Sequence, residues 1–122
     1  MKKELRQEVH LKYCGKCAYC GKDIQYKDMQ VDHIIPESRF FRFLHRHKNE
    51  YKVDDFINLN PACRVCNHYK RVWTVEEFRS EMLTLHKRAA QQYLFKIALD
   101  YGMATIKPFD GVFYFEKGKS SI

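Results

Sequence analysis

Two Cys-x-x-Cys pairs constrain this chain of 122 residues more than any other feature of its sequence. The first pair is Cys17 and Cys20, the second is Cys63 and Cys66, and 42 residues lie between the pairs. A gap of two residues lets neighbouring thiolates occupy two corners of a tetrahedron while backbone amides turn toward the sulfurs. Together the pairs complete a closed four-cysteine site, which predicts a structural zinc ion rather than a catalytic one.

Disulfides and an iron–sulfur centre are the alternatives to zinc. The N-terminus has no apolar stretch behind its charges, so we expect no signal peptide and a cytoplasmic location. Thiols stay reduced there, which disfavours disulfides, and the sequence offers no redox context for an iron–sulfur centre. Cys14 lies outside the pattern. It could pair with Cys17 as another Cys-x-x-Cys, but we expect a free thiol at the end of the first helix.

The composition is that of a single globular domain over residues 1–122. The chain is 45% hydrophobic and 30% charged, which is typical of neither a disordered chain nor a membrane protein. No apolar run approaches the roughly 20 residues that a membrane helix needs, so no membrane partner is expected. The formal net charge of +7 suits a polyanion such as DNA or RNA, although many basic proteins bind no nucleic acid.

The segments around the cysteines predict an α+β fold. Apolar residues in 2–13 share one face of a helix. Residues 29–35 form a short buried strand, and residues 58–62 form a second extended piece that leads into the second cysteine pair. A helix then starts from that pair, over about 67–73.

The C-terminal part is expected to add a long helix and a hairpin. Residues 74–77, Thr-Val-Glu-Glu, form a capping-box signal for a helix over 75–101. Unbroken, this helix would be about 40 Å long, so it either breaks or extends beyond the core to meet a partner. Its apolar stripe packs in the core, forms a homodimer face, or joins a larger nuclease or packaging complex. Residues 104–107 and 112–116 are expected to form a closing β-hairpin.

An Asp-His pair lies on the first strand, between the two cysteine pairs. Asp32 and His33 would point to opposite faces of that strand, so the pair alone proves little. A metal that joins the cysteine pairs brings the strand near Asn67, the residue after Cys66. Carboxylate and amide oxygens suit a hard divalent ion, and a neutral imidazole can accept a proton from water. These groups are suitable for metal-assisted phosphodiester hydrolysis.

Residues 36–57 are rich in basic and aromatic side chains. On a short helix, Phe40 and Phe43 fall on one side and the arginines on another. We expect the aromatics either to pack beneath the site or to stack on bases, and the arginines to contact phosphate. The candidate nucleic-acid-binding residues of the whole chain are Arg39, Arg42, Arg64, Lys70 and Arg71.

These motifs resemble the HNH endonucleases of the ββα-metal (His-Me finger) superfamily. The resemblance is carried by Cys17-Ala-Tyr-Cys20-Gly, Val31-Asp32-His33-Ile-Ile-Pro36, Asn58-Leu59 and Cys63-Arg-Val-Cys66-Asn67-His-Tyr-Lys70. It covers residues 14–73 closely, and the flanking helices look like those of small standalone bacterial and phage members. It implies a ββα-metal core with a four-cysteine zinc site, between an N-terminal helix and the C-terminal helix and hairpin of residues 74–116.

The resemblance also implies a role for each matching position. His33 matches the general base that activates water, and Asp32 and Asn67 match the ligands of a catalytic Mg²⁺ or Mn²⁺. Asn58 matches the residue that steadies the loop holding the histidine, and Lys70 a basic position expected to contact phosphate. The sequence departs from the family pattern in two places. Asn67 stands at the last position of the His-Asn-His motif, where His is more frequent. The loop after Pro36 contains Phe and Arg, where the family often has glycines.

The implied activity is hydrolysis of double-stranded DNA with one divalent ion and a His-activated water, leaving 5′-phosphate and 3′-hydroxyl ends. The alternative is a zinc-stabilised module that binds nucleic acid or a nuclease complex and does not cut. That alternative explains the charge and the cysteines but gives Asp32, His33 and Asn67 no task.

Overall fold

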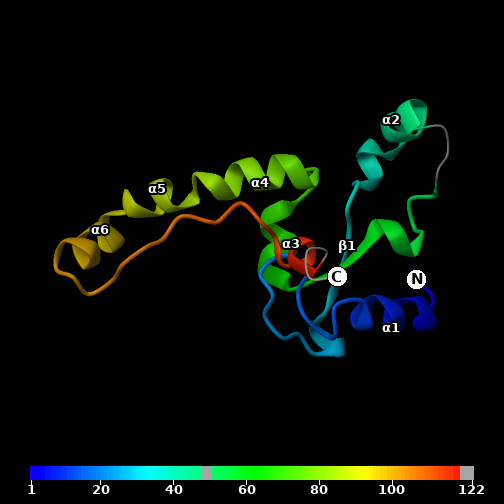
Figure 1. Ribbon diagram of the computed structural model, residues 1–122, viewed down its shortest axis with the longest axis horizontal. Helices are drawn as coiled ribbons and strands as arrows, with labels where there is room; N and C mark the ends of the chain where they lie inside the picture. Colours follow the sequence, from blue (N-terminus) through cyan, green and yellow to red (C-terminus); the bar gives the residue numbers. More distant parts are fainter. Residues whose placement is uncertain (48–50, 119–122) are drawn as a thin grey trace. The chain divides into compact units, whose positions relative to one another are not determined.

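The computed structural model describes residues 1–47 and 51–118 (Figure 1). It contains two compact units, Met1–Val75 with Phe113–Ile122 and Glu76–Val112. The expectation of one nuclease domain over residues 1–122 stays a prediction. None of the described helices is long and apolar enough to cross a membrane.

The first unit is built on a ββα core. Strand β1 (Gln30–His33) pairs antiparallel with β2 (Leu59–Ala62), with Asp32 opposite Asn60. Helix α3 (Arg64–Lys70) follows β2 directly and lies beside β1 (Figure 1). Its first turn is capped by the Cys63 sulfur, which accepts a hydrogen bond from the Cys66 amide. The predicted α+β fold class and its ββα core are confirmed.

Helix α1 (Lys3–Leu11) covers this sheet, as its apolar periodicity predicts. Val9 is fully buried and packs with Met29 and Leu59, next to partly buried apolar side chains. The short 3-10 helices Tyr26–Asp28 and Phe56–Asn58 precede the two strands. The core of this unit is therefore a small cluster beneath the strands that carry the predicted site.

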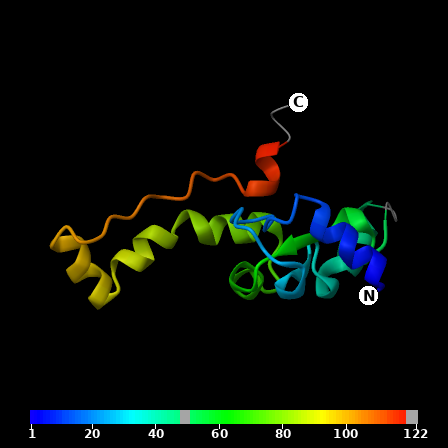
Figure 2. The same cartoon turned by 90° about the horizontal axis from the view of Figure 1, so that it is seen from below.

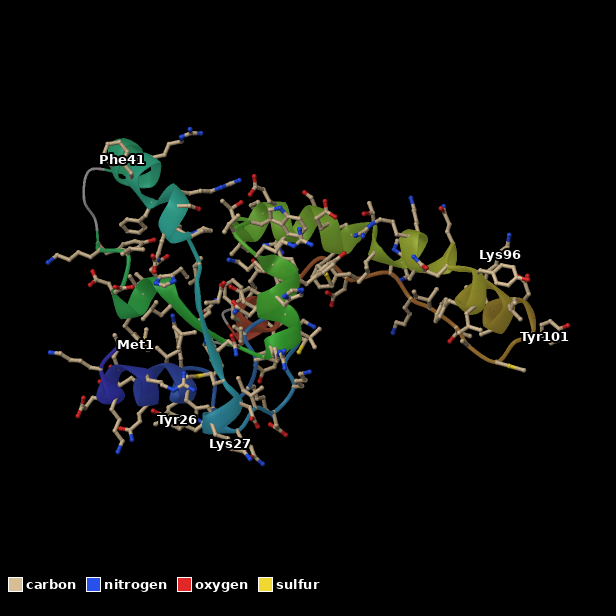
Figure 3. The ribbon with its side chains drawn as sticks, turned by 180° about the vertical axis from the view of Figure 1, so that it is seen from behind. Met1, Tyr26, Lys27, Phe41, Lys96 and Tyr101 are labelled. Carbon is tan, nitrogen blue, oxygen red and sulfur yellow. The ribbon has the colours of Figure 1, made fainter. Side chains whose placement is uncertain are left out.

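Helix α2 (Glu37–His47) fills much of the connection between the strands. Phe40 is buried and its ring lies 5.9 Å from the Tyr51 ring, which favours packing over base stacking for this aromatic. Phe41 is 82% exposed and projects outward (Figure 3). Phe43 and Arg46 have side chains outside the part of the chain that the structure describes.

The second unit contains three helices where a single helix over 75–101 was one expectation. They are α4 (Val75–Leu83), α5 (Leu85–Ala90) and α6 (Tyr93–Asp100). The first break is at Thr84, whose hydroxyl donates to the Glu81 carbonyl, and the second is at Gln92, whose backbone is extended. The Thr84 side chain and the extended backbone of Gln92 interrupt the helical hydrogen bonds. The predicted helix therefore breaks rather than continuing over its full length.

The predicted C-terminal hairpin is wrong. Residues 103–112 run back along the helices of their unit without forming a strand (Figures 1 and 2), and Pro108 removes a backbone donor. Helix α7 (Tyr114–Lys117) takes the place of the second expected strand. The amides of Tyr114 and Phe115 donate to the carbonyls of Tyr19 and Ala18 at 3.2 and 2.7 Å, so the first cysteine loop satisfies the bonds that a hairpin partner would have made.

Candidate active site

The four predicted zinc ligands come together. The sulfur atoms of Cys17, Cys20, Cys63 and Cys66 all lie within 4.8 Å of one another. A tetrahedral zinc ion with Zn–S distances of about 2.3 Å requires sulfur–sulfur edges of about 3.8 Å. The sulfurs of Cys20 and Cys63 are 3.9 Å apart, so the four residues fit such an ion.

Backbone amides point at these sulfurs. The Cys17 sulfur accepts hydrogen bonds from the amides of Tyr19 and Cys63, at 3.4 and 3.3 Å. The pKa of Cys17 is lowered to about 4, first by a hydrogen bond from the Cys66 thiol and then, against the effect of burial, by backbone donors. A thiolate is the form that binds a metal ion, so the loop favours the binding state of Cys17.

Close packing fixes the first cysteine loop. Gly21 has a φ of +80°, and a Cβ atom there would lie 2.7 Å from the Tyr114 ring. The Ala18 amide donates to the Pro61 carbonyl at 2.8 Å, which joins the loop to β2. The loop is therefore bonded to β2, while α3 contacts β1.

Asp32 is buried on the face of β1 that is turned toward α3, and each of its carboxylate oxygens has a hydrogen-bond donor. The Tyr19 hydroxyl donates to Oδ2, and the Lys70 ammonium lies 3.1 Å from Oδ1. Burial raises the pKa of Asp32, although the Lys70 charge and the Tyr19 hydrogen bond act in the opposite direction. Burial likewise lowers the pKa of Lys70, against the pull of Asp32.

Lys70 is the clearest departure from the predicted contacts. Its side chain is 0% exposed, and its ammonium donates both to Asp32 and, at 3.0 Å, to the His33 carbonyl. A buried ammonium with these partners does not reach a phosphate at the surface. The predicted phosphate contact is therefore corrected: Lys70 holds the two neighbouring site residues on β1.

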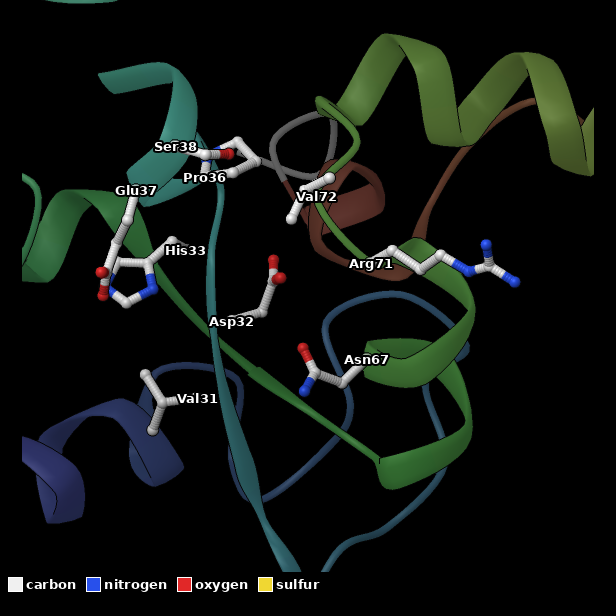
Figure 4. A pocket seen from close by; sticks show the side chains of 9 residues that line it. All are labelled: Val31, Asp32, His33, Pro36, Glu37, Ser38, Asn67, Arg71 and Val72. Carbon is white, nitrogen blue, oxygen red and sulfur yellow. The ribbon is translucent and has the colours of Figure 1, made fainter. Parts of the chain in front are cut away.

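His33 points to the other face of β1 (Figure 4). Its Nε2 atom lies 2.8 Å from Oδ1 of Asp54 and 3.6 Å from Oε1 of Glu37. The side chain is 20% exposed, whereas both carboxylates are largely exposed. His33 is therefore more exposed to water than Asp32, whose side chain is 4% exposed.

Asn58 is fully buried and joins two segments of backbone. Its Oδ1 accepts from the Ile35 amide at 2.9 Å, and its Nδ2 donates to the carbonyls of Ile35 and Val53 at 3.1 and 2.9 Å. These bonds fix the backbone just after His33. They agree with a supporting role for Asn58 and leave its amide no free donor for a substrate.

Asn67 lies on α3 and faces β1. Its Nδ2 donates to Oε1 of Gln30 at 3.2 Å, which leaves the amide oxygen as the atom directed toward Asp32 (Figure 4). Asp32, His33 and Asn67 all line one open cleft of about 600 Å³. The three residues come from β1 and α3, which are far apart in sequence, and the structure places all three around this cleft.

The oxygen donors in this cleft fit a hard divalent ion. An ionised carboxylate offers about four lone-pair positions, and Tyr19 and Lys70 together engage one on each oxygen of Asp32. The Asn67 amide oxygen adds a neutral donor of the type that Mg²⁺ and Mn²⁺ accept. The Lys70 charge weakens this site without removing its ligands.

The other basic candidates differ in exposure. Arg71 is exposed and lines the cleft, and Arg42 and Arg64 are exposed on α2 and α3. Arg39 is half-buried.

Sequence reasoning missed Tyr19, Glu37 and Asp54. Tyr19 stands between the first two cysteines, and Glu37 follows His33 by four residues, but neither spacing predicts the observed contact. Asn60 is another contact that the sequence does not indicate: it is fully buried on β2 opposite Asp32, and its Nδ2 lies 3.5 Å from the Tyr19 hydroxyl. These contacts depend on strand register and on the fold of the cysteine loop.

Comparison with known proteins identifies a matching family model. Residues 17–71 match the family model of HNH endonucleases, which supports a nuclease-type activity in general terms. A similar solved structure is the Type II-C Cas9 enzyme from Actinomyces naeslundii, with a TM-score of 0.49 and 23% identity, over 63% of this chain and 7% of that one. No curated protein matches the chain. The resemblance seen in the motifs is thus confirmed by the match of residues 17–71 to the HNH endonuclease family model.

Proposed function

We propose that this protein is a metal-dependent endonuclease that hydrolyses phosphodiester bonds of double-stranded DNA. The observation that supports it best is the cleft shared by Asp32, His33 and Asn67, with Arg71 at its edge. A carboxylate, an amide oxygen and an imidazole open to water are the groups such a reaction needs.

Each residue has a separate task in the proposed reaction. Asp32 and Asn67 hold a Mg²⁺ or Mn²⁺ ion, which when bound supplies positive charge against the charge that develops on the phosphate. His33 accepts a proton from the attacking water. Asn58 keeps the backbone after His33 in place through its bonds to Ile35. The products have 5′-phosphate and 3′-hydroxyl ends.

Arginine side chains supply the proposed contacts to the DNA backbone. They are Arg39, Arg42, Arg64 and Arg71. Contacts of this kind make binding fall with rising salt and remain largely indifferent to base sequence. The structural zinc ion on the four cysteines and a cytoplasmic location, where thiols stay reduced, complete the proposal.

The second unit supports a partner surface within residues 75–101. Tyr93, Leu94 and Tyr101 are each more than three-quarters exposed, at 80%, 81% and 77%. Such side chains favour a homodimer or a larger nuclease complex over a core position. This part of the proposal is independent of the cleft.

Plasmid nicking by wild type and His33→Ala tests the activity. Supercoiled plasmid is incubated with Mg²⁺ or Mn²⁺, and without added divalent ion in a sample whose zinc content is verified. Loss of the base should lower the rate by about 10²- to 10⁴-fold while leaving the circular dichroism spectrum unchanged. Equal rates for variant and wild type would remove His33 from the mechanism.

A zinc-stabilised binding module remains the second candidate. It is favoured by the Lys70 ammonium, which already neutralises Asp32 at 3.1 Å. Such a protein would shift DNA in a gel under the same conditions without nicking it in Mg²⁺ or Mn²⁺.

A further inference from the structure

His33 has two ring nitrogens, and the structure distinguishes them. Nε2 lies 2.8 Å from Oδ1 of Asp54. An ionised carboxylate only accepts hydrogen bonds, so this contact places the ring proton on Nε2. In the neutral ring the lone pair is then on Nδ1, because the hydrogen bond made by one nitrogen sets the state of the other.

The second nitrogen is available for chemistry. Among the described residues, Nδ1 of His33 has no hydrogen-bond partner. Figure 4 shows the Glu37 carboxylate at one edge of the ring and the second nitrogen at the opposite edge, on the side of β1 that leads to Asp32. The ring therefore presents its lone pair away from the two acidic side chains.

We propose that Asp54 is a positioning residue for His33, an inference that rests on the proposed function. Asp54 fixes the ring by its bond to Nε2–H, so that Nδ1 is the atom that takes the proton from water. After the transfer the ring carries a proton on each nitrogen and a positive charge that the Asp54 carboxylate balances. The proton on Nδ1 then returns to solvent, and the starting state is restored.

The backbone around Asp54 is held by the residue that also holds the His33 loop. Asn58 donates to the Val53 carbonyl at 2.9 Å and bonds both backbone groups of Ile35. One buried amide therefore connects the residue before Asp54 with the segment after His33. This connection holds the backbone next to Asp54 close to the segment that follows His33.

Glu37 is the competing partner, and its geometry is weaker. Its Oε1 lies 3.6 Å from Nε2, beyond a hydrogen bond, and its side chain is 70% exposed at the start of α2. It can replace Asp54 when Asp54 is removed. A test of Asp54 therefore needs the double variant with Glu37→Gln as well as the single substitution.

Nuclear magnetic resonance of the full chain tests the hydrogen bond without any activity assay. Nitrogen-15 shifts and the ring proton of His33 are measured at pH 8 in wild type, Asp54→Ala and Asp54→Ala/Glu37→Gln, with assignment from His33→Gln. We expect a proton on Nε2 of wild type, shifted downfield by its hydrogen bond, and loss of that shift in the double variant. An unprotonated Nε2 in wild type, as a metal ligand would show, overturns the inference.

Single-turnover cleavage tests the consequence. We expect Asp54→Ala/Glu37→Gln to lower the rate at saturating DNA by about 10- to 100-fold, with DNA affinity equal or tighter because negative charge is removed. Asp54→Glu should restore part of the rate, and Asp28→Asn, which removes an exposed carboxylate elsewhere in the unit, should change nothing. A double variant within twofold of wild type, or one that loses only affinity, overturns the inference.

Failure of the proposed function gives a different result. An inactive wild type in which the Asp54 bond is seen by resonance contradicts the nuclease and leaves the positioning contact supported. An active wild type without that bond contradicts the positioning contact alone.

Discussion

The two faces of strand β1 differ sharply, although Asp32 and His33 are neighbours in sequence. Asp32 is 4% exposed and is held by a phenol and an ammonium from two other segments. His33 is partly exposed to solvent and contacts exposed carboxylate side chains at the surface. Because side chains alternate along a strand, neighbouring residues can differ strongly in exposure even where both line one cleft.

The difference suits the two roles proposed for these residues. As a proposed metal ligand, Asp32 has its position fixed by burial beside Tyr19 and Lys70. As the proposed base, His33 has the greater exposure that contact with water requires. Lys70 connects the two faces, because its ammonium binds the Asp32 side chain and the His33 carbonyl.

Removing one of the four cysteines should unfold the first unit and so disrupt the surroundings of both Asp32 and His33. Cys63→Ser breaks the four-cysteine site and the cap of α3, since the Cys63 sulfur accepts from the Cys66 amide. Structural zinc supplies about 10–16 kcal/mol of apparent binding free energy in small domains, so the first unit should unfold. Circular dichroism and elemental analysis of zinc measure this loss. Cys14→Ser is the control, because Cys14 is exposed and lies outside the cluster, and it should keep wild-type zinc and melting temperature.

Lys70→Met should destabilise the buried surroundings of Asp32 more than those of His33. The substitution leaves Asp32 buried without its ion-pair partner, which costs about 3–5 kcal/mol of unfolding free energy. Urea unfolding followed by the fluorescence of Trp73, the single tryptophan, measures the first unit. Wild-type stability in this variant would mean that Asp32 and Lys70 do not form an ion pair in solution.

The same variant should also show a pH dependence with a definite sign. Burial already raises the pKa of Asp32, and loss of the Lys70 charge removes the largest opposing effect. Above about pH 4 the unfolded carboxyl has lost its proton while the native one retains it. Native protein then binds more protons than unfolded protein, so stability falls as pH rises through this window. Adding Asp32→Asn removes the titrating group and should recover much of the loss at neutral pH.

For the residues around Asp32, the sequence predicted which ones come together better than it predicted their contacts. Cysteine spacing predicted the four-cysteine cluster, and joining the two cysteine pairs predicted that the strand of Asp32 and His33 lies near Asn67. The sequence predicts a phosphate contact for Lys70, because spacing along α3 does not show which way a lysine points or how deep it lies. The hairpin failed for a similar reason, since the amides of Tyr114 and Phe115 found acceptors in the first cysteine loop, more than ninety positions earlier in the chain.

The exposed face was predicted least. Asp54 reaches His33 across 21 positions of sequence, through a loop whose path depends on the buried amide of Asn58. No periodicity reports such a contact. The same limit applies to the second unit. Its sequence predicted a helix beginning at Val75, but the breaks at Thr84 and Gln92 depend on local hydrogen bonds and backbone conformation.

Tyr19→Phe should give the smallest of these effects and the most specific one. It removes the donor to Oδ2 of Asp32 while keeping the ring, which packs 5.4 Å from Phe113 and 5.8 Å from Phe115. Loss of one buried hydrogen bond costs about 1–3 kcal/mol in urea unfolding. Because Asp32 keeps its partner Lys70, we expect a folded protein that needs more Mg²⁺ for half-maximal cleavage.

The control for Tyr19 removes an equal hydroxyl from the same aromatic neighbourhood. Tyr13 is half-buried and its ring lies 6.3 Å from the Phe115 ring, so Tyr13→Phe keeps the packing and leaves the Asp32 contacts untouched. It should change the unfolding free energy by less than about 0.5 kcal/mol and leave the Mg²⁺ requirement unchanged. If both variants behave alike, the Tyr19 hydroxyl does not fix the Asp32 carboxylate, and Lys70 alone holds it in position.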